Sequence, residues 1–174
     1  MTKRNIQVSL RKGNINDAEK VLELQKEVLL ESEFMISVIE EYEETSEQIR
    51  NWIEKILENE REKLIVAESK GQIVGLIVFR SKSNKRLSHT GSFTAMVKKE
   101  YRNQGIGKLL IKELLKWAEH NPLIEKVSLG VLSTNQRAIE LYKSMGFVEE
   151  GRKIKEVKFS DDLYVDDILM YKQV

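Results

Sequence analysis

Hydrophobic positions recur along the chain with two different periods, and each period predicts one kind of element. Segments that alternate apolar and polar residues, or that are apolar throughout, predict β-strands, whereas apolar residues three and four apart predict amphipathic helices. Strands are expected at residues 6–11, 63–68, 73–79, 87–97, 126–131, 147–159 and 163–171. Helices are expected from residue 16 or 17 to about 31, from 46 through 57, from 106 to 120, and from 134 or 135 to 144.

Turn and cap residues divide these elements. Asn16 or Asp17 is expected to cap the first helix and Ser46 the second, and residues 32–45, which lack a clean period, predict a loop with a short helical turn. Gly75 lies inside a predicted strand, which indicates a bulge or a close backbone approach. Hairpins early in the chain and strand–helix–strand crossovers later predict an α/β fold with a mixed sheet and helices on both faces. We find no internal repeat or linker, so residues 1–174 are expected to form one domain.

Composition narrows the class of protein. The chain has 174 residues, of which 41% are hydrophobic and 33% charged, and its net charge is +1, so no global charge favours nucleic acid or a membrane as partner. The absence of cysteine excludes disulfides, cysteine-bound metals and a thioester formed on the protein. No apolar run approaches the roughly 18 residues of a membrane span and no signal peptide is evident, so we expect a cytoplasmic protein. We also expect no bound metal.

The segment 97–117, VKKEYRNQGIGKLLIKELLKW, is predicted to be a strand end, a basic glycine-containing turn and an amphipathic helix. Backbone N–H groups and the positive end of the helix dipole meet at such a junction and suit a phosphate. Gly105 and Gly107 allow a ligand to approach the backbone, but they are equally compatible with a plain tight turn. A dinucleotide fingerprint fits poorly, because Leu110 occupies the third glycine position, and this disfavours a nucleotide-binding oxidoreductase.

A second group of residues follows one crossover later. It reads Asn135-x-x-Ala138-x-x-Leu141-Tyr142-x-x-x-Gly146-Phe147. Asn135 and Tyr142 are seven residues apart, about two helical turns, and therefore share a helix face. Taken singly, an asparagine here is typical of a helix cap and a tyrosine of a half-buried core residue.

Together the two motifs resemble the GCN5-related N-acetyltransferases (GNAT), a family that uses acetyl-CoA. The turn at 102–107 is similar to the family pattern Q/R-x-x-G-x-G/A, and the later run is similar to N-x-x-A-x-x-L-Y-x-x-x-G-F. The match covers roughly residues 93–151, and the order of elements fits the whole chain. The resemblance implies a seven-stranded, mostly antiparallel mixed sheet, with about four helices on its two faces. Strand 94–97 would splay away from its parallel neighbour, 126–131.

The resemblance also implies roles for individual residues. The backbone of the strand before the turn would pair with the pantetheine arm and the acetyl carbonyl, and the turn with its helix start would hold the pyrophosphate. Asn135 would hold the pantetheine arm, and Tyr142 would protonate the departing thiolate while the amine attacks directly. The implied acetyl-CoA contacts are Ala95, Met96, Val97, Arg102, Asn103, Gln104, Gly105, Ile106, Gly107, Lys108 and Asn135.

One family feature is missing. Certain members carry a glutamate as general base on the fifth strand, where Gly130 stands here. Water, Glu33, Glu40, His89 or an acidic residue of the last hairpin are the open candidates. Among the hairpin residues, Asp166 and Asp167 either reach the pocket or lie at its rim.

The acceptor is predicted to be a primary amine of a small molecule or of a peptide or protein N-terminus. Residues 27–62 include twelve acidic and three basic side chains, which indicates either attraction of a cationic acceptor or simply solvated helix faces. The last two strands resemble those of the ribosomal-protein, polyamine and antibiotic acetyltransferases. A non-catalytic acyl-CoA-binding module on the same fold is the alternative function, and a homodimer remains open.

Overall fold

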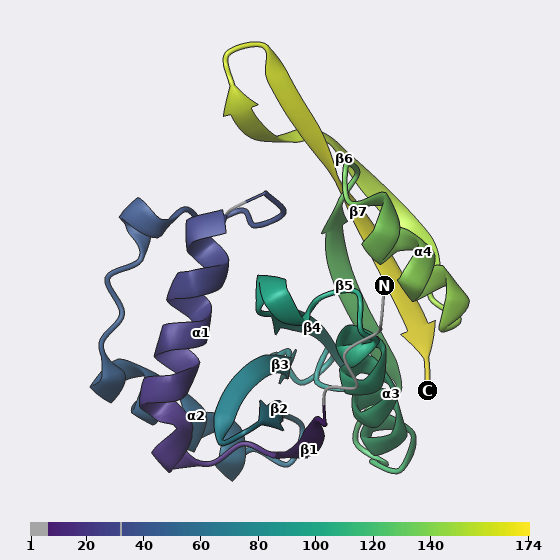
Figure 1. Ribbon diagram of the computed structural model, residues 1–174. Coiled ribbons are helices and arrows are strands. Elements are labelled where there is room, and N and C mark those ends of the chain that lie inside the picture. Colours follow the sequence, from purple (N-terminus) through teal and green to yellow (C-terminus); the bar gives the residue numbers. More distant parts are fainter. Residues whose placement is uncertain (1–6, 32) are drawn as a thin grey trace.

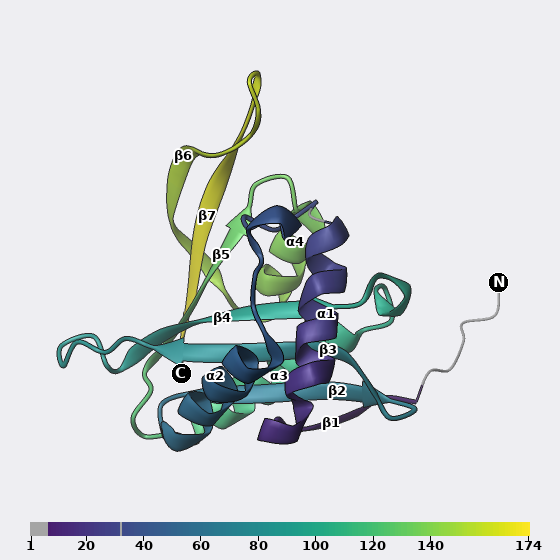
Figure 2. The ribbon, with the colours of Figure 1, turned by 90° about the vertical axis from the view of Figure 1, so that its left-hand side faces the viewer.

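The computed structural model of the protein describes residues 7–31 and 33–174, and its strands form one seven-stranded sheet with helices on both faces (Figures 1 and 2). The strand order is β1-β2-β3-β4-β5-β7-β6, and every recorded pairing is antiparallel except that of β4 with β5. The strands are β1 (Ser9–Lys12), β2 (Lys63–Ser69), β3 (Gln72–Ser81), β4 (Thr90–Val97), β5 (Lys126–Leu132), β6 (Val148–Ser160) and β7 (Leu163–Gln173). The helices are α1 (Ala18–Glu31), α2 (Ser46–Glu58), α3 (Ile106–Glu119) and α4 (Gln136–Ser144), with 3₁₀ turns η1 (Ile15–Asp17), η2 (Ile39–Glu41) and η3 (Lys99–Tyr101).

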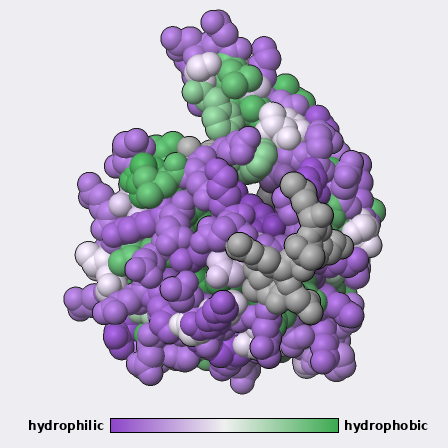
Figure 3. All heavy atoms as spheres, viewed as in Figure 1, coloured by the Kyte–Doolittle hydropathy of each residue, from purple (hydrophilic) through white to green (hydrophobic). Residues whose placement is uncertain are grey.

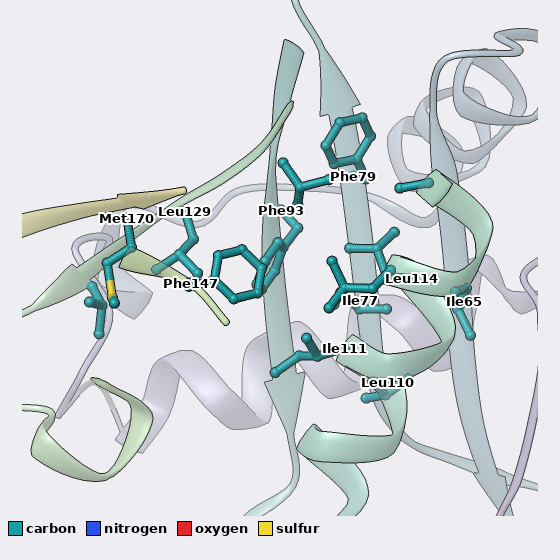
Figure 4. Close-up of a cluster of buried hydrophobic side chains, with 14 of the residues drawn as sticks. Ile65, Ile77, Phe79, Phe93, Leu110, Ile111, Leu114, Leu129, Phe147 and Met170 are labelled. Atoms are coloured by element: carbon teal, nitrogen blue, oxygen red, sulfur yellow. The ribbon is translucent and has the colours of Figure 1, made fainter. Parts of the chain in front are cut away.

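Alternation along the central strands sorts the core into two layers. On β2, Ile65 and Ala67 join the cluster beneath α3 and α4, whereas Leu64 and Val66 join the cluster beneath α1 and α2. Figure 4 shows part of the first cluster, in which α3 packs its leucines against the sheet. The central strands β2 and β3 are therefore buried on both faces, as expected for strands that are apolar throughout.

The parallel pair β4–β5 is short. Only Thr90, Gly91 and Ser92 of β4 pair with β5, at Lys126, Val127 and Ser128. Beyond Ser92 the strands diverge, and Figure 2 shows β5 turning away from β4 together with β6 and β7. This confirms the splay that the family resemblance implied.

The β6–β7 hairpin extends beyond the body of the molecule (Figure 1). Hydrophobic side chains gather on it (Figure 3), and the large exposed ones are Val148, Ile154, Phe159, Leu163 and Tyr164. Two lysines of β6, Lys155 and Lys158, each place an ammonium 5.8 Å from the centroid of the Tyr164 ring. Within the described residues no helix is long and apolar enough to cross a bilayer.

The predicted helices are confirmed, and Asn135 caps α4 as expected, but the caps of the first two helices are one to three residues earlier than expected. Asn14, not Asn16 or Asp17, caps the first helical turn: its side chain accepts from the Asn16 N–H, and Asp17 Oδ2 accepts from the Asn14 N–H at 2.9 Å. Thr45, not Ser46, caps α2 and accepts from the Gln48 N–H. In both cases two reciprocal hydrogen bonds form a capping box, which a single preferred residue type does not indicate.

Two strands begin three residues later than the sequence predicts. β1 runs over Ser9–Lys12 rather than 6–11, and Ile6 lies outside the described residues. β4 begins at Thr90 rather than at Leu87, because the Leu87 and Thr90 N–H groups close successive turns onto the carbonyls of Asn84 and Leu87.

The expectation for Gly75 is correct on both counts. The pairing register shifts next to it, and a β-carbon on Gly75 would lie 3.0 Å from the Met96 carbonyl oxygen.

Candidate active site between the splayed strands

A cleft of about 960 Å³ opens where β4 and β5 separate. Its walls come from β4, β5, the turn before α3, the face of α4, residues 33–37 after α1, and Asp167 of β7. A volume of this size is typical of a small-molecule or cofactor site. Of the twelve site residues predicted from the sequence, all but Gln104 line this cleft.

The turn before α3 exposes its backbone to the cleft. Asn103 and Gly105 adopt positive φ angles of 66° and 83°, and Gly105 stands at the N-cap of the 14-residue helix α3. The first N–H groups of α3 have no partner one turn back within the helix. A β-carbon on Gly105 would meet nothing within 4 Å, and one on Gly107 would meet only Leu141 Cδ2, at 4.0 Å. The turn therefore has open amides and a positive helix dipole, which fit a pyrophosphate.

The Arg102 side chain contacts the protein itself. Its Nε donates to the Val97 carbonyl at 2.9 Å, and its Nη1 lies 2.7 Å from Glu31 Oε2. It therefore connects the end of β4 with the end of α1. Gln104 Nε2 donates to the Glu100 carbonyl at 2.9 Å, so its side chain braces the turn.

One edge of β4 is available to a ligand beyond Ser92. Ala95, Met96 and Val97 pair with Ile77, Leu76 and Gly75 of β3, whereas recorded pairing with β5 has ended by that point. A strand edge without a neighbouring strand presents N–H and C=O groups that an extended ligand can pair with. The pantetheine arm of acetyl-CoA is such a ligand, and the backbone of this edge fits it.

The opposite wall comes from α4. Asn135 is its N-cap, and Asn135 Oδ1 accepts from the Ala138 N–H at 3.2 Å. This bond orients the side-chain amide and uses only its oxygen, so the two N–H donors of the amide are not used by the cap. Asn135, Ala138 and Tyr142 all line the cleft, as their spacing on one helix face predicts.

Tyr142 is held by aromatic packing. Its ring lies edge-on to Phe93 and Phe147, at centroid distances of 5.8 and 6.0 Å. Burial raises the pKa of the Tyr142 hydroxyl to about 12, because the apolar surroundings disfavour the phenolate. The hydroxyl is thus protonated at neutral pH and can donate a proton, but it cannot serve as a base there.

The candidates for a general base separate clearly. Glu33 and Asp167 line the cleft, whereas Glu40 and His89 are not among its lining residues. Asp166 is not among the lining residues either, and its carboxylate bonds within the β6–β7 hairpin. Its Oδ1 accepts from the Lys155 N–H at 2.7 Å, and its Oδ2 lies 3.4 Å from Arg152 Nη1.

Sequence reasoning missed the wall formed by residues 34–37, Phe-Met-Ile-Ser. The only available signal was a group of apolar residues in a segment without a period.

Comparison with known proteins identifies the family. Residues 24–147 match the model of the Acetyltransferase (GNAT) family. The chain belongs to this GNAT acetyltransferase family. Its two motifs and its splayed strand pair are thus those of a GNAT fold.

Individual relatives agree with this assignment. The L-amino acid N-acetyltransferase AaaT of Escherichia coli is 28% identical over 119 residues, which cover 68% of this chain and 73% of that protein. A GNAT-family acetyltransferase structure from Streptococcus pneumoniae superposes with a TM-score of 0.92 at 27% identity, covering 97% of this chain and all of that one. YncA, a putative acetyltransferase from Salmonella typhimurium solved with its cofactor acetyl-CoA, has the same fold, with a TM-score of 0.85 at 18% identity over 96% and 94% of the two chains. The reaction class of this GNAT protein is acetyl-CoA-dependent N-acetyl transfer.

Proposed function

We propose that the cleft between β4 and β5 is the active site, and that a primary amine of a small molecule or of a peptide N-terminus takes the acetyl group there in one direct transfer. The observation that carries the proposal is that the open turn before α3, the free edge of β4 and the Tyr142 hydroxyl all line one cleft. When bound there, acetyl-CoA supplies an activated thioester. The chain contains no cysteine to take up the acetyl group as a thioester of its own.

The turn and the start of α3 hold the phosphates in this proposal. The N–H groups of Gly107 and Lys108 belong to the first helical turn, and both residues line the cleft. Their donors and the helix dipole favour an anion, and the Lys108 ammonium adds a positive charge. The Arg102 guanidinium already contacts Val97 and Glu31, so it fixes the position of the turn. Arg102 therefore contributes its backbone to the phosphate site, and not its guanidinium.

The two walls align the reacting group. The backbone of Ala95, Met96 and Val97 pairs with the arm along β4, and an N–H of this edge polarises the acetyl carbonyl. Preorganised donors aimed at a developing oxyanion are usually a large term in acyl transfer. The Asn135 amide donates from the opposite wall, and the Tyr142 hydroxyl gives its proton to the departing sulfur.

The acceptor is an amine whose approach is favoured by carboxylates in the cleft. Glu33 and Asp167 both line it, and Glu33 belongs to the acidic segment 27–62. AaaT, whose name describes acetylation of L-amino acids, is the relative that supports a small amine as acceptor.

The experiment that tests the proposal measures free CoA thiol released from acetyl-CoA by the purified protein across L-amino acids, polyamines, an aminoglycoside and short peptides. We expect release that requires both the protein and one class of primary amine, with the N-acetyl product identified by mass spectrometry. Binding of CoA in a calorimeter without release for any amine would contradict the proposal and would indicate an acyl-CoA-binding module instead.

A further inference from the structure

The carboxylate of Asp167 occupies the place that the missing side chain of Gly130 leaves open. Asp167 lies on β7, next to β5, and its side chain is only 10% exposed although it lines the cleft. A β-carbon on Gly130 would come within 2.8 Å of Asp167 Oδ1. Any larger residue at position 130 would therefore displace this carboxylate, and glycine allows it to lie over β5.

We propose that Asp167 binds the ammonium of the acceptor and takes its proton. The inference rests on the proposed function and names the base that the function requires. A primary alkyl amine is protonated at neutral pH, with a pKa near 10.4 for a lysine-like group, and must lose a proton before its nitrogen can attack. A buried carboxylate in the cleft wall is suited both to hold the cation and to accept that proton.

Asp167 and Tyr142 approach the cleft from opposite faces of the sheet. Leu129 and Val131 of β5 and Ile168 of β7 pack in the cluster beneath α3 and α4. Since side chains alternate along a strand, Gly130 and Asp167 face the other side, toward α1. Tyr142 comes from α4 and packs in the α3–α4 cluster. This arrangement suits direct transfer, in which the amine arrives on one side of the carbonyl carbon and the sulfur leaves on another.

The structure already places an ammonium beside this carboxylate. Lys153 Nζ of β6 lies 3.6 Å from Asp167 Oδ2 and 3.5 Å from Glu156 Oε1, and the Lys153 side chain is 50% exposed. Lys153 thus forms an ion pair with Asp167, and its other partner, Glu156, lies on β6 as well. A flexible lysine of this kind can exchange with an incoming amine while it keeps its contact with Glu156.

The proton balance is complete with these two side chains. An ammonium R–NH₃⁺ has three N–H protons and the amide product has one. Asp167 takes the first proton and passes it to solvent, which frees the lone pair that forms the N–C bond as the C–S bond breaks. Tyr142 gives its proton to the sulfur, the second N–H proton passes to solvent as the amide forms, and a proton from solvent restores the Tyr142 hydroxyl. The net products are the N-acetyl amine, free CoA and one proton in solution.

The test compares Asp167→Asn with the wild-type protein, and uses Asp162→Asn at the hairpin tip as the matched control. The probes are n-hexylamine, spermidine and L-methionine. At pH 7, CoA release by Asp167→Asn should have kcat/KM lower by about 10²–10⁴-fold, the range for a lost general base. The defect should become smaller as the pH approaches the pKa of the amine, because an unprotonated amine needs no base.

A second readout is calorimetric binding of the same probes to the protein saturated with CoA. Asp167→Asn should weaken amine binding at least about tenfold, Asp162→Asn should leave it unchanged, and Lys153→Gln should strengthen it by removing the competing ammonium. A kcat/KM within twofold of wild type, or a loss that does not change with pH in a variant of wild-type thermal stability, overturns the role of Asp167. If the wild-type protein releases no CoA with any amine, the proposed function fails. In that case the calorimetric binding of the amine tests the role of Asp167 by itself, and equal amine affinity in Asp167→Asn and wild type overturns that role.

Discussion

Tyr142 is the side chain on which the proposed chemistry depends most directly. Tyr142→Phe removes the hydroxyl and keeps the ring against Phe93 and Phe147, so stability and acetyl-CoA affinity should stay close to wild type. We expect kcat to fall by about 10²–10⁴-fold, the usual contribution of a positioned acid. Because burial raises the pKa of Tyr142 to about 12, its deprotonation should not cause a loss of activity below about pH 11. Stopped-time CoA release over pH 6–11 measures both points, and unchanged turnover across that series would show that the hydroxyl has no role as an acid.

A substitution at Gly107 should change the affinity for acetyl-CoA without lowering the stability of the protein. Gly107→Ala fits the space available, and alanine in a helix is favoured over glycine by roughly 0.5–1 kcal/mol, so the melting temperature should rise or stay the same. The added methyl lies among the cleft residues, where it hinders approach of a phosphate to the α3 amides. We expect the Kd for acetyl-CoA to increase about tenfold, or about 1.4 kcal/mol.

The matched control for Gly107 is Gly151→Ala on β6. A β-carbon on Gly151 would meet nothing within 4 Å, so alanine fits there too, but Gly151 does not line the cleft. Calorimetry with acetyl-CoA should therefore give a wild-type Kd for Gly151→Ala. Equal affinity in both variants would place the phosphates elsewhere.

Residue types and their spacing predicted part of the site. Asn135 and Tyr142 could be placed in one wall because seven residues on a helix return to the same face. The partner of Arg102 could not be foreseen, because Glu31 is distant in sequence and meets it only through the packing of α1 on the sheet. The position of Asp167 over Gly130 likewise depends on β7 lying beside β5, which no local pattern specifies.

At the scale of elements, two ion pairs hold α1 to the segment that follows β4, and one of them, Arg102–Glu31, lines the cleft. Lys98 pairs with Glu27 at 3.0 Å, and Arg102 pairs with Glu31 one turn further along α1. The Lys98 side chain is 10% exposed, whereas that of Glu27 is 46% exposed. This asymmetry allows the contribution of the pair to be tested.

Glu27→Ala should destabilise the protein by about 1–3 kcal/mol, because it leaves a buried ammonium without its partner. Lys98→Met should cost less, within about 1 kcal/mol, since the methionine fills the same volume and Glu27 can turn to water. Urea unfolding of the two variants measures the difference. A larger loss for Lys98→Met than for Glu27→Ala would contradict the burial assigned to this pair.

Element order was predictable because each helix and strand carries its own period. The boundaries were less so: β4 starts later than its apolar pattern indicates, because hydrogen-bonded turns occupy residues 84–90. The caps at Asn14 and Thr45 depend on reciprocal bonds with residues three positions later rather than on one residue type.

At the scale of the whole molecule, the sheet is divided at the point where β4 and β5 part. One side carries α1 and α2, the other carries α3 and α4, and the cleft lies at the division, so groups from both faces line it. The early hairpins and the later strand–helix–strand crossovers predicted a mixed sheet. The length of the parallel pairing, only three residues on each strand, is visible only in the assembled sheet.

The measurement that tests the central claim most directly is an initial-rate series in which acetyl-CoA and the accepted amine are varied together. If the amine attacks directly in a cleft that holds both substrates, double-reciprocal plots should intersect, and protein incubated with acetyl-CoA alone should keep its mass. Parallel lines, which indicate a ping-pong reaction, or an acetylated protein that transfers its group to the amine, would contradict direct transfer between β4 and β5.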